Sequence, residues 1–276
     1  MIKRQDLRIR DPYVFVDKNN SCYYLYGSIN LENSYKTSPT FWVYKSYDLE
    51  SFEEPKKIFD GQKIGFWADQ DYWAPELHEY NGKYYLFASF KAEGKRRACQ
   101  ILVGDKPDGE FSPLSNSPIT LPSWDCLDGT FFVDGGKPYM VFCHEWVQIN
   151  NGEICAVELS TDLSCAVGEP FTLFKASDNP FVSEHVKGSG NYVTDGPFLY
   201  REDNKIKMIW SSFKDGKYAI FGATSNSIFD KWQHFDSKFD FCGGHAMLFT
   251  DLKGQRFIAL HTPNKTNFER AIFYKV

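Results

Sequence analysis

The chain has 276 residues, a net charge of −5, 42% apolar residues and 24% charged residues, which is an ordinary composition for a soluble globular protein. Its negative charge and lack of a basic cluster argue against a nucleic-acid surface, and no apolar run is long enough to span a membrane. A chain of this length can bury a sizeable core, and we predict a single domain over residues 1–276.

The N-terminal segment MIKRQDLRIR (1–10) lacks the apolar core of a secretion signal. The chain has seven cysteines, an odd number without CxxC spacing, which is typical of reduced thiols rather than a disulfide framework. We therefore predict a cytoplasmic protein. A secreted or periplasmic location stays open as the alternative, because cleavage of a signal peptide would leave the same kind of start.

Five segments in chain order share the pattern of a β-hairpin, with a small or acidic opening, a polar turn and a second strand that ends near Ser, Thr or His. They are residues 11–28, 74–89, 128–144, 193–212 and 244–262. A third β-like segment follows each hairpin, at 41–49, 97–105, 153–161, 218–226 and 270–276. A unit of three or four antiparallel strands repeated five times predicts an all-β fold, a five-bladed β-propeller.

Two segments are insertions between these units rather than repeats. Residues 29–40 and 175–192 are rich in Asn, Ser, Gly and Pro, which is typical of loops. Loops of this length in a compact domain are more often functional than idle, and we expect both to rim one face of the propeller.

The openings of the five hairpins converge on the propeller axis, because the innermost strand of each blade lines the central channel. They are Asp11, Ala74, Asp128, Asp195 and Gly244. Turn chemistry alone explains any one aspartate before Pro or Gly, but three in register favour a functional site. Like charges in a confined space raise one another's pKa values, which suits either a metal site or acid–base cleavage of a glycosidic bond.

Four motifs in these strands resemble those of glycoside hydrolase family 43. They are RDP (10–12), WAPE (73–76), LDGTFF (127–132) and GGH (243–245), and the resemblance covers essentially the whole chain. It implies a five-bladed propeller that acts on arabinose- or xylose-containing oligosaccharides or polysaccharides with inversion at the anomeric carbon. No cofactor is required, and a structural calcium ion is compatible with the resemblance.

The resemblance also implies roles for the three aspartates. Asp11 matches the general base that activates water, Asp128 matches the acid that tunes and orients the proton donor, and Asp195 occupies the place of the donor. The family's donor is usually a glutamate before Gly-Pro, so Asp195 is one methylene shorter, about 1.5 Å of reach. An inverting pair needs about 6.5–9.5 Å between carboxyls, so this difference leaves Glu76 or Glu145 as alternative donors.

Four further residues are candidates for binding the substrate: Trp73, Glu76, His245 and Arg270. The residue that matches His245 in the family lies beneath the sugar site near water or calcium, and Arg270 resembles the arginine that holds the terminal sugar. His245 is therefore also a candidate metal ligand, although calcium prefers oxygen ligands. Trp73 is a candidate sugar platform, with core packing as the alternative.

Two other functions are compatible with this pattern. A propeller that binds glycans without cleaving them is supported by the aspartate at position 195, where the family usually has glutamate. An enzyme that acts on fructosides is disfavoured, because the N-D-P-N-G opening of such proteins is missing. The sugar, the choice between exo and endo cleavage, and the oligomeric state do not follow from the sequence.

Overall fold

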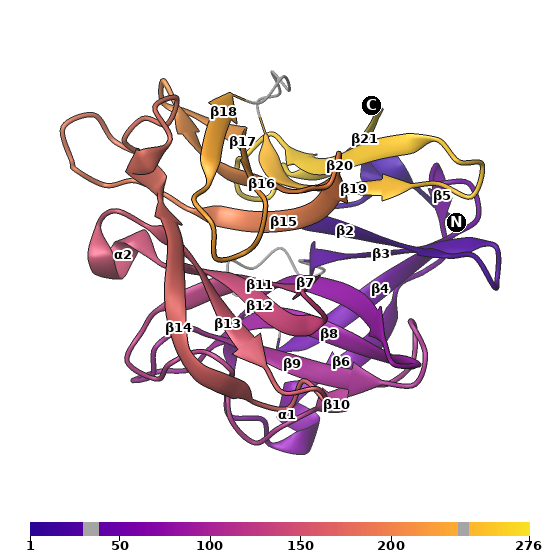
Figure 1. Cartoon of the computed structure of the whole chain (residues 1–276). Helices are drawn as coiled ribbons and strands as arrows, with labels where there is room; N and C mark the ends of the chain where they lie inside the picture. Colours follow the sequence, from indigo (N-terminus) through magenta and orange to yellow (C-terminus); the bar gives the residue numbers. More distant parts are fainter. Residues whose placement is uncertain (30–38, 237–242) are drawn as a thin grey trace.

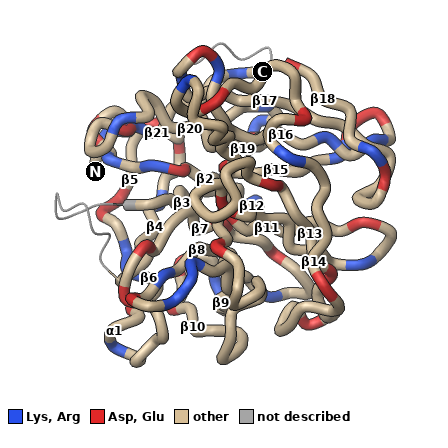
Figure 2. Tube along the Cα trace, turned by 90° about the vertical axis from the view of Figure 1, so that its left-hand side faces the viewer, with Lys and Arg blue, Asp and Glu red and all other residues tan. Residues whose placement is uncertain are grey.

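The computed structural model describes residues 1–29, 39–236 and 243–276, whose strands form five antiparallel sheets around a common axis (Figure 1). Figure 2 looks along this axis and shows the first strand of each predicted hairpin, β2, β7, β11, β15 or β19, nearest the centre. The predicted all-β, five-bladed β-propeller is thereby confirmed.

The first sheet contains β1 (Ile2–Lys3), β2 (Ile9–Asp17), β3 (Cys22–Ile29), β4 (Thr40–Ser46), β5 (Ser51–Phe52) and β6 (Lys56–Asp60). The second contains β7 (Gln70–Tyr80), β8 (Lys83–Lys91), β9 (Ala98–Gly104) and β10 (Ser112–Pro113). The third contains β11 (Cys126–Asp134), β12 (Lys137–His144), β13 (Glu153–Leu159) and β14 (Ala166–Lys175). The fourth contains β15 (Asp195–Glu202), β16 (Lys205–Lys214), β17 (Lys217–Ser225) and β18 (Gln233–Asp236). The fifth contains β19 (Gly244–Thr250), β20 (Arg256–Thr262) and β21 (Arg270–Lys275).

Short helical turns connect some of these strands. They are α1 (Gly61–Ile64), α2 (Trp146–Ile149) and the 3₁₀ turns η1 (Arg4–Asp6) and η2 (Ala176–Asp178). Within the described residues, no helix is long and apolar enough to cross a membrane.

Each predicted hairpin forms the first two strands of a sheet, and each predicted third segment forms the next strand, β4, β9, β13, β17 or β21. Tight turns explain three of the hairpins. Asn81-Gly82, Gly135-Gly136 and Asp203-Asn204 connect their strands with positive φ at both residues, the geometry of a two-residue turn that matches the twist of the strands. The turn residues in the sequence therefore fix the pairing register of these hairpins.

A β-bulge interrupts the inner strand of every sheet at the same place, just after the residue paired with the end of the second strand. The residue in the bulge has a positive φ between 44° and 56°. These residues are Asp11, Ala74, Asp128, Gly196 and His245. A bulge re-aims the side chains around it, and here five bulges bring their residues to the axis.

This register corrects the sequence-based alignment of two blades. We expected Asp195 and Gly244 to be equivalent to Asp11 and Asp128, but they lie one position earlier, where Asp195 pairs with Ser211 and Gly244 pairs with His261. The positive-φ position belongs to the next residue in the chain, which is glycine in the fourth blade and His245 in the fifth. The sequence openings look alike because small and acidic residues are suited to both positions of a bulge.

The two segments expected to be loops differ in what the structure describes. Residues 30–38, most of the first loop, lie outside the described residues. The second connects β14 to β15, and its Ser183 amide donates a hydrogen bond to the Phe213 carbonyl oxygen at 2.8 Å. Its His185 ring contacts Trp146 of α2, with the ring centroids 5.2 Å apart.

Aromatic and aliphatic side chains pack between neighbouring sheets. In one such cluster Phe174 of the third sheet contacts Trp210 of the fourth, with ring centroids 5.5 Å apart, and Phe221 is fully buried beside them. Four cysteines expected to pack as thiols are free and fully buried. These are Cys99, Cys126, Cys143 and Cys155.

Candidate active site

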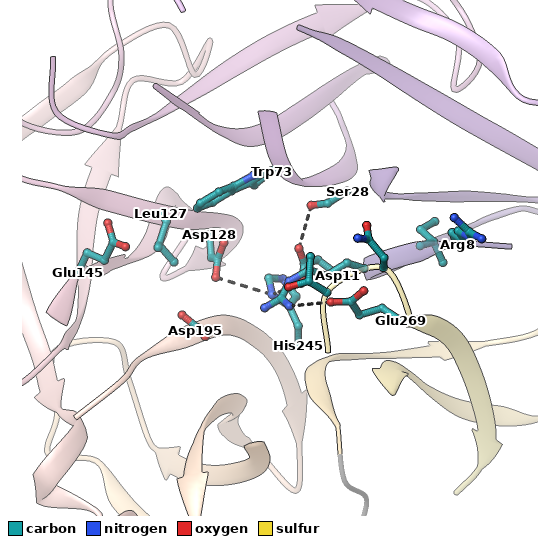
Figure 3. Close-up of a pocket in the computed structure, with 14 residues that line it drawn as sticks. Arg8, Asp11, Ser28, Trp73, Leu127, Asp128, Glu145, Asp195, His245 and Glu269 are labelled. Carbon is teal, nitrogen blue, oxygen red and sulfur yellow. Dashed lines mark hydrogen bonds and ion pairs between the residues drawn. The ribbon is translucent and has the colours of Figure 1, made fainter. Parts of the chain in front are cut away.

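A cavity of about 400 Å³ lies at the axis of the propeller, among the inner strands (Figure 3). Asp11 from β2, Asp128 from β11 and Asp195 from β15 all line it, so the structure brings the three predicted catalytic carboxyls into one space. Figure 3 shows Trp73 and Asp195 on opposite sides of Asp128. The predicted residues Trp73, Glu145 and His245 also line this cavity.

Asp11 is buried, and its carboxylate is held by polar and positive groups. Ser28 Oγ donates to Asp11 Oδ2 at 2.8 Å, and Arg10 Nε lies 3.4 Å from Oδ1. Burial alone would raise the pKa of the Asp11 carboxyl. The charges of His245 and Arg10 outweigh that effect and hold its pKa below the usual value. Asp11 is therefore ionised and able to accept a proton.

His245 lies between two of the carboxyls. Its Nδ1 is 3.2 Å from Asp11 Oδ1 and 3.7 Å from Asp128 Oδ2. Burial opposes a charge on the imidazole, but the two carboxyls raise the pKa of His245 above its usual value. The ring therefore favours the protonated form and neutralises part of the acidic cluster.

The surroundings of His245 do not fit a calcium ion. Its Nδ1 faces two carboxylate oxygens as a donor, whereas calcium needs six to eight oxygen ligands. In residues 1–29, 39–236 and 243–276 no three His, Cys, Asp or Glu side chains are grouped to hold a metal. Calcium at this site stays a prediction.

Asp128 and Asp195 form a coupled acidic pair. The Gly196 amide donates to Asp128 Oδ2 at 2.9 Å, which connects Asp128 to the residue that follows Asp195. Burial raises the pKa of Asp128 to about 7, and the charge of Asp195 adds to this effect. Burial also raises the pKa of Asp195 above its usual value, although Arg10 and His245 act against it. The pair therefore retains a proton under conditions in which Asp11 is ionised.

Trp73 and Glu145 share a buried partner, Arg97. The Arg97 guanidinium lies over the Trp73 ring, 4.1 Å from its centroid, and donates to Glu145 Oε2 at 2.5 Å. It also donates to Asp71 Oδ2 at 2.7 Å. Burial raises the pKa of Glu145 above its usual value, and the charge and hydrogen bond of Arg97 act against that effect. Glu145 is a weaker candidate donor than Asp195 because its Oε2 is already bound by the Arg97 guanidinium. Trp73 presents an aromatic wall to the cavity, as expected of a sugar platform.

Glu76 and Arg270 do not line the cavity. Glu76 is buried, and its Oε2 lies 3.2 Å from His78 Nε2. Arg270 donates from Nε to the carbonyl oxygen of Gln5 and from Nη1 to that of Glu269. The contact with Gln5 connects the C-terminal strand to the N-terminal segment. Sugar binding by either residue stays a prediction that this geometry does not support.

Sequence reasoning missed three residues at the site. Arg10 and Glu269 line the cavity and form an ion pair of 3.3 Å, and Tyr218 donates from its hydroxyl to Asp195 Oδ2 at 3.0 Å. Arg10 lies inside the quoted RDP motif, so its position was a usable signal. Glu269 and Tyr218 come from parts of the chain without a motif, and only the folded ring brings them near the axis.

Three comparisons with known proteins bear on this site. The chain aligns with a solved endo-arabinase of Bacteroides thetaiotaomicron VPI-5482 at 42% identity and a TM-score of 0.91, covering 100% of this chain and 96% of that one. A family model described as "Glycosyl hydrolases family 43" matches residues 5–274. The chain belongs to glycoside hydrolase family 43. Family 43 is an inverting family, so the predicted family and enzyme class are confirmed.

Two curated relatives match only part of the chain. Xylosidase/arabinosidase 43A of Humicola insolens is 32% identical over 111 residues, which are 37% of this chain and 32% of that protein. A probable arabinan endo-1,5-α-L-arabinosidase A of Aspergillus fumigatus is 23% identical over 157 residues, which are 55% of this chain and 44% of that protein. The matched part is thus less than half the length of each relative.

Proposed function

We propose that this protein is an inverting hydrolase of arabinosyl linkages in arabinose-containing oligosaccharides or polysaccharides, with xylosyl linkages as the second candidate. The observation that carries the proposal is the contrast between an ionised Asp11 and a proton-retaining Asp128–Asp195 pair in one cavity. Two carboxyls whose environments push their pKa values apart are the requirement for acid–base cleavage of a glycosidic bond.

In this mechanism Asp11 accepts a proton from the attacking water, while Asp195 gives its proton to the oxygen of the leaving group. Asp128 holds the backbone at Gly196 by the hydrogen bond to its amide, and its charge favours the protonated form of Asp195. His245 and Arg10 stabilise Asp11 as the anion. The Trp73 ring forms an apolar wall against which a sugar ring can pack.

The choice of sugar rests on similarity. A 42% identical protein is described as an endo-arabinase, and the curated relatives are described as xylosidase/arabinosidase and arabinan endo-arabinosidase. Arabinan is therefore the first polysaccharide to test, with xylo-oligosaccharides as the comparison.

Replacement of Asp11 tests the proposal directly. We expect Asp11→Asn to lower the turnover of arabinan or aryl arabinofuranosides by about 10²- to 10⁴-fold, because the amide cannot accept the proton of water. Asparagine tolerates the positive φ at this position, so the backbone stays as it is. The measurement is release of reducing ends, with NMR of the first-formed anomer to show inversion.

The matched control is Asp215→Asn, which changes an exposed turn aspartate that also has a positive φ. We expect this variant to keep wild-type turnover. Wild-type turnover in Asp11→Asn, or retention of the anomeric configuration, would contradict the proposed function.

A further inference from the structure

Tyr218 reaches the propeller axis from the third strand of its blade, β17, whereas the predicted catalytic aspartates are on first strands. Its side chain is buried, and its hydroxyl donates to Asp195 Oδ2 at 3.0 Å. Burial and the nearby Asp195 raise the pKa of Tyr218 well above its usual value. The hydroxyl therefore keeps its proton and acts as a permanent donor to Asp195.

The path of this side chain depends on a glycine in the neighbouring blade. A Cβ atom at Gly244 would lie 2.4 Å from Tyr218 Cε1 and 2.8 Å from Ser211 Oγ, closer than real contacts allow. Any other residue at position 244 would therefore displace the tyrosine ring or the strand. The opening of the fifth hairpin is small because the ring of Tyr218 passes beside it.

Two further rings hold Tyr218 in place. The His261 ring stacks on it with the centroids 5.7 Å apart and the planes 20° apart. The Phe213 ring contacts it at 5.5 Å with a tilt of 60°. The hydroxyl therefore has a fixed position against Asp195, rather than one chosen by a mobile surface side chain.

We propose that Tyr218 is a positioning residue for Asp195, holding one carboxyl oxygen so that the proton for the leaving group is on the other. This inference rests on the proposed function, in which Asp195 is the donor. The aspartate has fewer rotatable bonds than the family's usual glutamate but also less reach, so the orientation of its carboxyl decides whether the proton points at the substrate. A hydrogen bond to Oδ2 sets that orientation.

The same bond strengthens during the reaction. Asp195 transfers its proton from Oδ1 to the glycosidic oxygen, the bond from that oxygen to the anomeric carbon breaks, and its electron pair stays with the leaving oxygen. Water adds to the anomeric carbon and loses a proton to Asp11. Negative charge thus develops on Asp195, and the Tyr218 hydroxyl is placed to stabilise it without giving up its own proton.

The experiment compares Tyr218→Phe with wild type on aryl arabinofuranosides or xylosides whose leaving phenols differ in acidity. Phenylalanine keeps the packing against His261 and Phe213 but removes the hydroxyl. We expect kcat/KM to fall about 10- to 100-fold for poor leaving groups, which need protonation, and by less than about 3-fold for dinitrophenyl substrates, which do not.

A pH profile provides a second readout. The bond to Tyr218 stabilises the anion of Asp195, so its loss raises the pKa of the donor and moves the basic limb of kcat to higher pH. The other charged or titratable groups that act on this site are unchanged in the variant. They are Arg10, Asp11, Asp128, Cys143, Glu145, His245 and His261.

The matched control is Tyr26→Phe, which removes a buried hydroxyl that donates to the Pro107 carbonyl oxygen at 2.6 Å. In this control we expect kcat/KM to depend on the leaving group as it does in wild type. In a second variant, Gly244→Ala, the added methyl group displaces the Tyr218 ring. We expect this variant to lose kcat/KM on poor leaving groups, as Tyr218→Phe does.

A double variant separates the role of Tyr218 from the assignment of Asp195 as the proton donor. In an Asp195→Ala background, Tyr218→Phe should change kcat/KM less than about 2-fold, because it acts only through Asp195. An undiminished effect in that background, or an equal loss on all leaving groups, overturns the role of Tyr218 alone. If Asp195→Ala shows no greater dependence on the leaving group than wild type, the donor assignment fails and the role of Tyr218 fails with it, whereas the proposed function is tested separately by Asp11→Asn.

Discussion

Asp128 acts on Asp195 in two separable ways, by a hydrogen bond and by its charge. Its Oδ2 accepts the Gly196 amide at 2.9 Å, which fixes the backbone next to Asp195. Its negative charge disfavours a second charge nearby, since burial leaves little solvent to screen the two carboxyls. An amide at position 128 would keep the first effect and remove the second.

We therefore expect Asp128→Asn to move the basic limb of kcat to lower pH. Loss of the like charge removes the repulsion between the two carboxyls, so Asp195 gives up its proton at a lower pH than in wild type. The shift is opposite in sign to that expected for Tyr218→Phe. Initial rates between pH 4 and 9 measure it, and an unchanged or upward-shifted basic limb in Asp128→Asn would count against the coupling.

At the scale of single residues, the sequence predicted the acidic cluster but not the groups that control it. Asp11 and Asp128 were recognisable because each opens a hairpin in a repeated pattern. Tyr218 and Glu269 were not, since each lies on or beside an outer strand and approaches the axis only in the folded ring. The one-residue shift of Asp195 relative to Asp11 depends on bulge register, which has no signature in single residue types.

At the scale of elements, the second strand of each hairpin has a buried residue near its end, and in four of the five blades this residue accepts a hydrogen bond from a backbone amide of the next blade. These residues pair with the last residue before each bulge and are Ser28, Ser89, Cys143, Ser211 and His261. Ser28, Ser89 and Ser211 accept the bulge amide of the following blade at 2.7–2.9 Å. Each bulge breaks the strand ladder and frees an amide, and the neighbouring blade supplies its partner.

The third blade is the exception to this pattern of hydrogen bonds, and the difference accounts for one contact of Asp128 in the active site. It has Cys143 at this position, and the Gly196 amide donates to Asp128 instead. A thiol is a weak acceptor, so a carboxylate takes the place of the serine hydroxyl. The catalytic candidate Asp128 therefore also performs the structural task that serine performs in other blades.

Ser89→Ala tests the hydrogen bonds between neighbouring blades at the Ser89 hydroxyl, which accepts the Asp128 amide, and leaves the carboxyl groups unchanged. The Asp128 amide would lose its acceptor in a buried site, so we expect the free energy of unfolding to fall by about 1–3 kcal/mol. Denaturant unfolding followed by tryptophan fluorescence measures the change. The control Ser189→Ala removes an exposed serine that caps a loop amide and should cost less than about 0.5 kcal/mol. Equal effects of the two variants would contradict the proposed role of Ser89.

The polar residues near the ends of the second strands were visible in the sequence, but their partners in the neighbouring blades were not. The predicted second strands end near Ser, Thr or His, and the structure shows that three serines and His261 at these ends bind the next blade. Hydrogen bonds between blades join residues 28 and 74 or 211 and 245, far apart in the chain. Local patterns predict the strands that hold such residues, whereas the partners follow from the closed ring.

At the scale of the whole molecule, the ring closes through side chains that join the two ends of the chain. The first sheet contains strands from residues 2–60 and the fifth contains β19–β21 from residues 244–275. A hydrophobic cluster joins them, with Leu25 and Phe52 on one side and Phe249 and Phe273 on the other. Arg10 adds an ion pair to Glu269 and a hydrogen bond to Asn264.

His261 occupies the point where this closure meets the active site. Its Nδ1 accepts the Asp11 amide at 3.2 Å, as serine does between other blades, and its Nε2 lies 3.4 Å from Asn264 Oδ1. These contacts need a neutral ring with the proton on Nε2. Burial, the main cause, lowers the pKa of His261 to about 3, far below the usual value near 6.5. A proton on Nδ1 would break the bond to the backbone of Asp11.

The closure should therefore weaken at acid pH. As the pH falls below 6.5, the unfolded chain gains a proton on His261 that the folded chain does not take up until about pH 3. The unfolded state is thus favoured progressively, and the stability that His261 contributes above pH 6.5 is lost as the pH falls, by at most about 1.4 kcal/mol for each pH unit.

His261→Asn offers an amide oxygen as acceptor but no titrating ring. We expect the unfolding free energy of wild type, minus that of His261→Asn, to be largest at pH 7 and to shrink steadily towards pH 4 in denaturant titrations. A difference that stays constant over this range would show that His261 does not close the ring as a neutral acceptor.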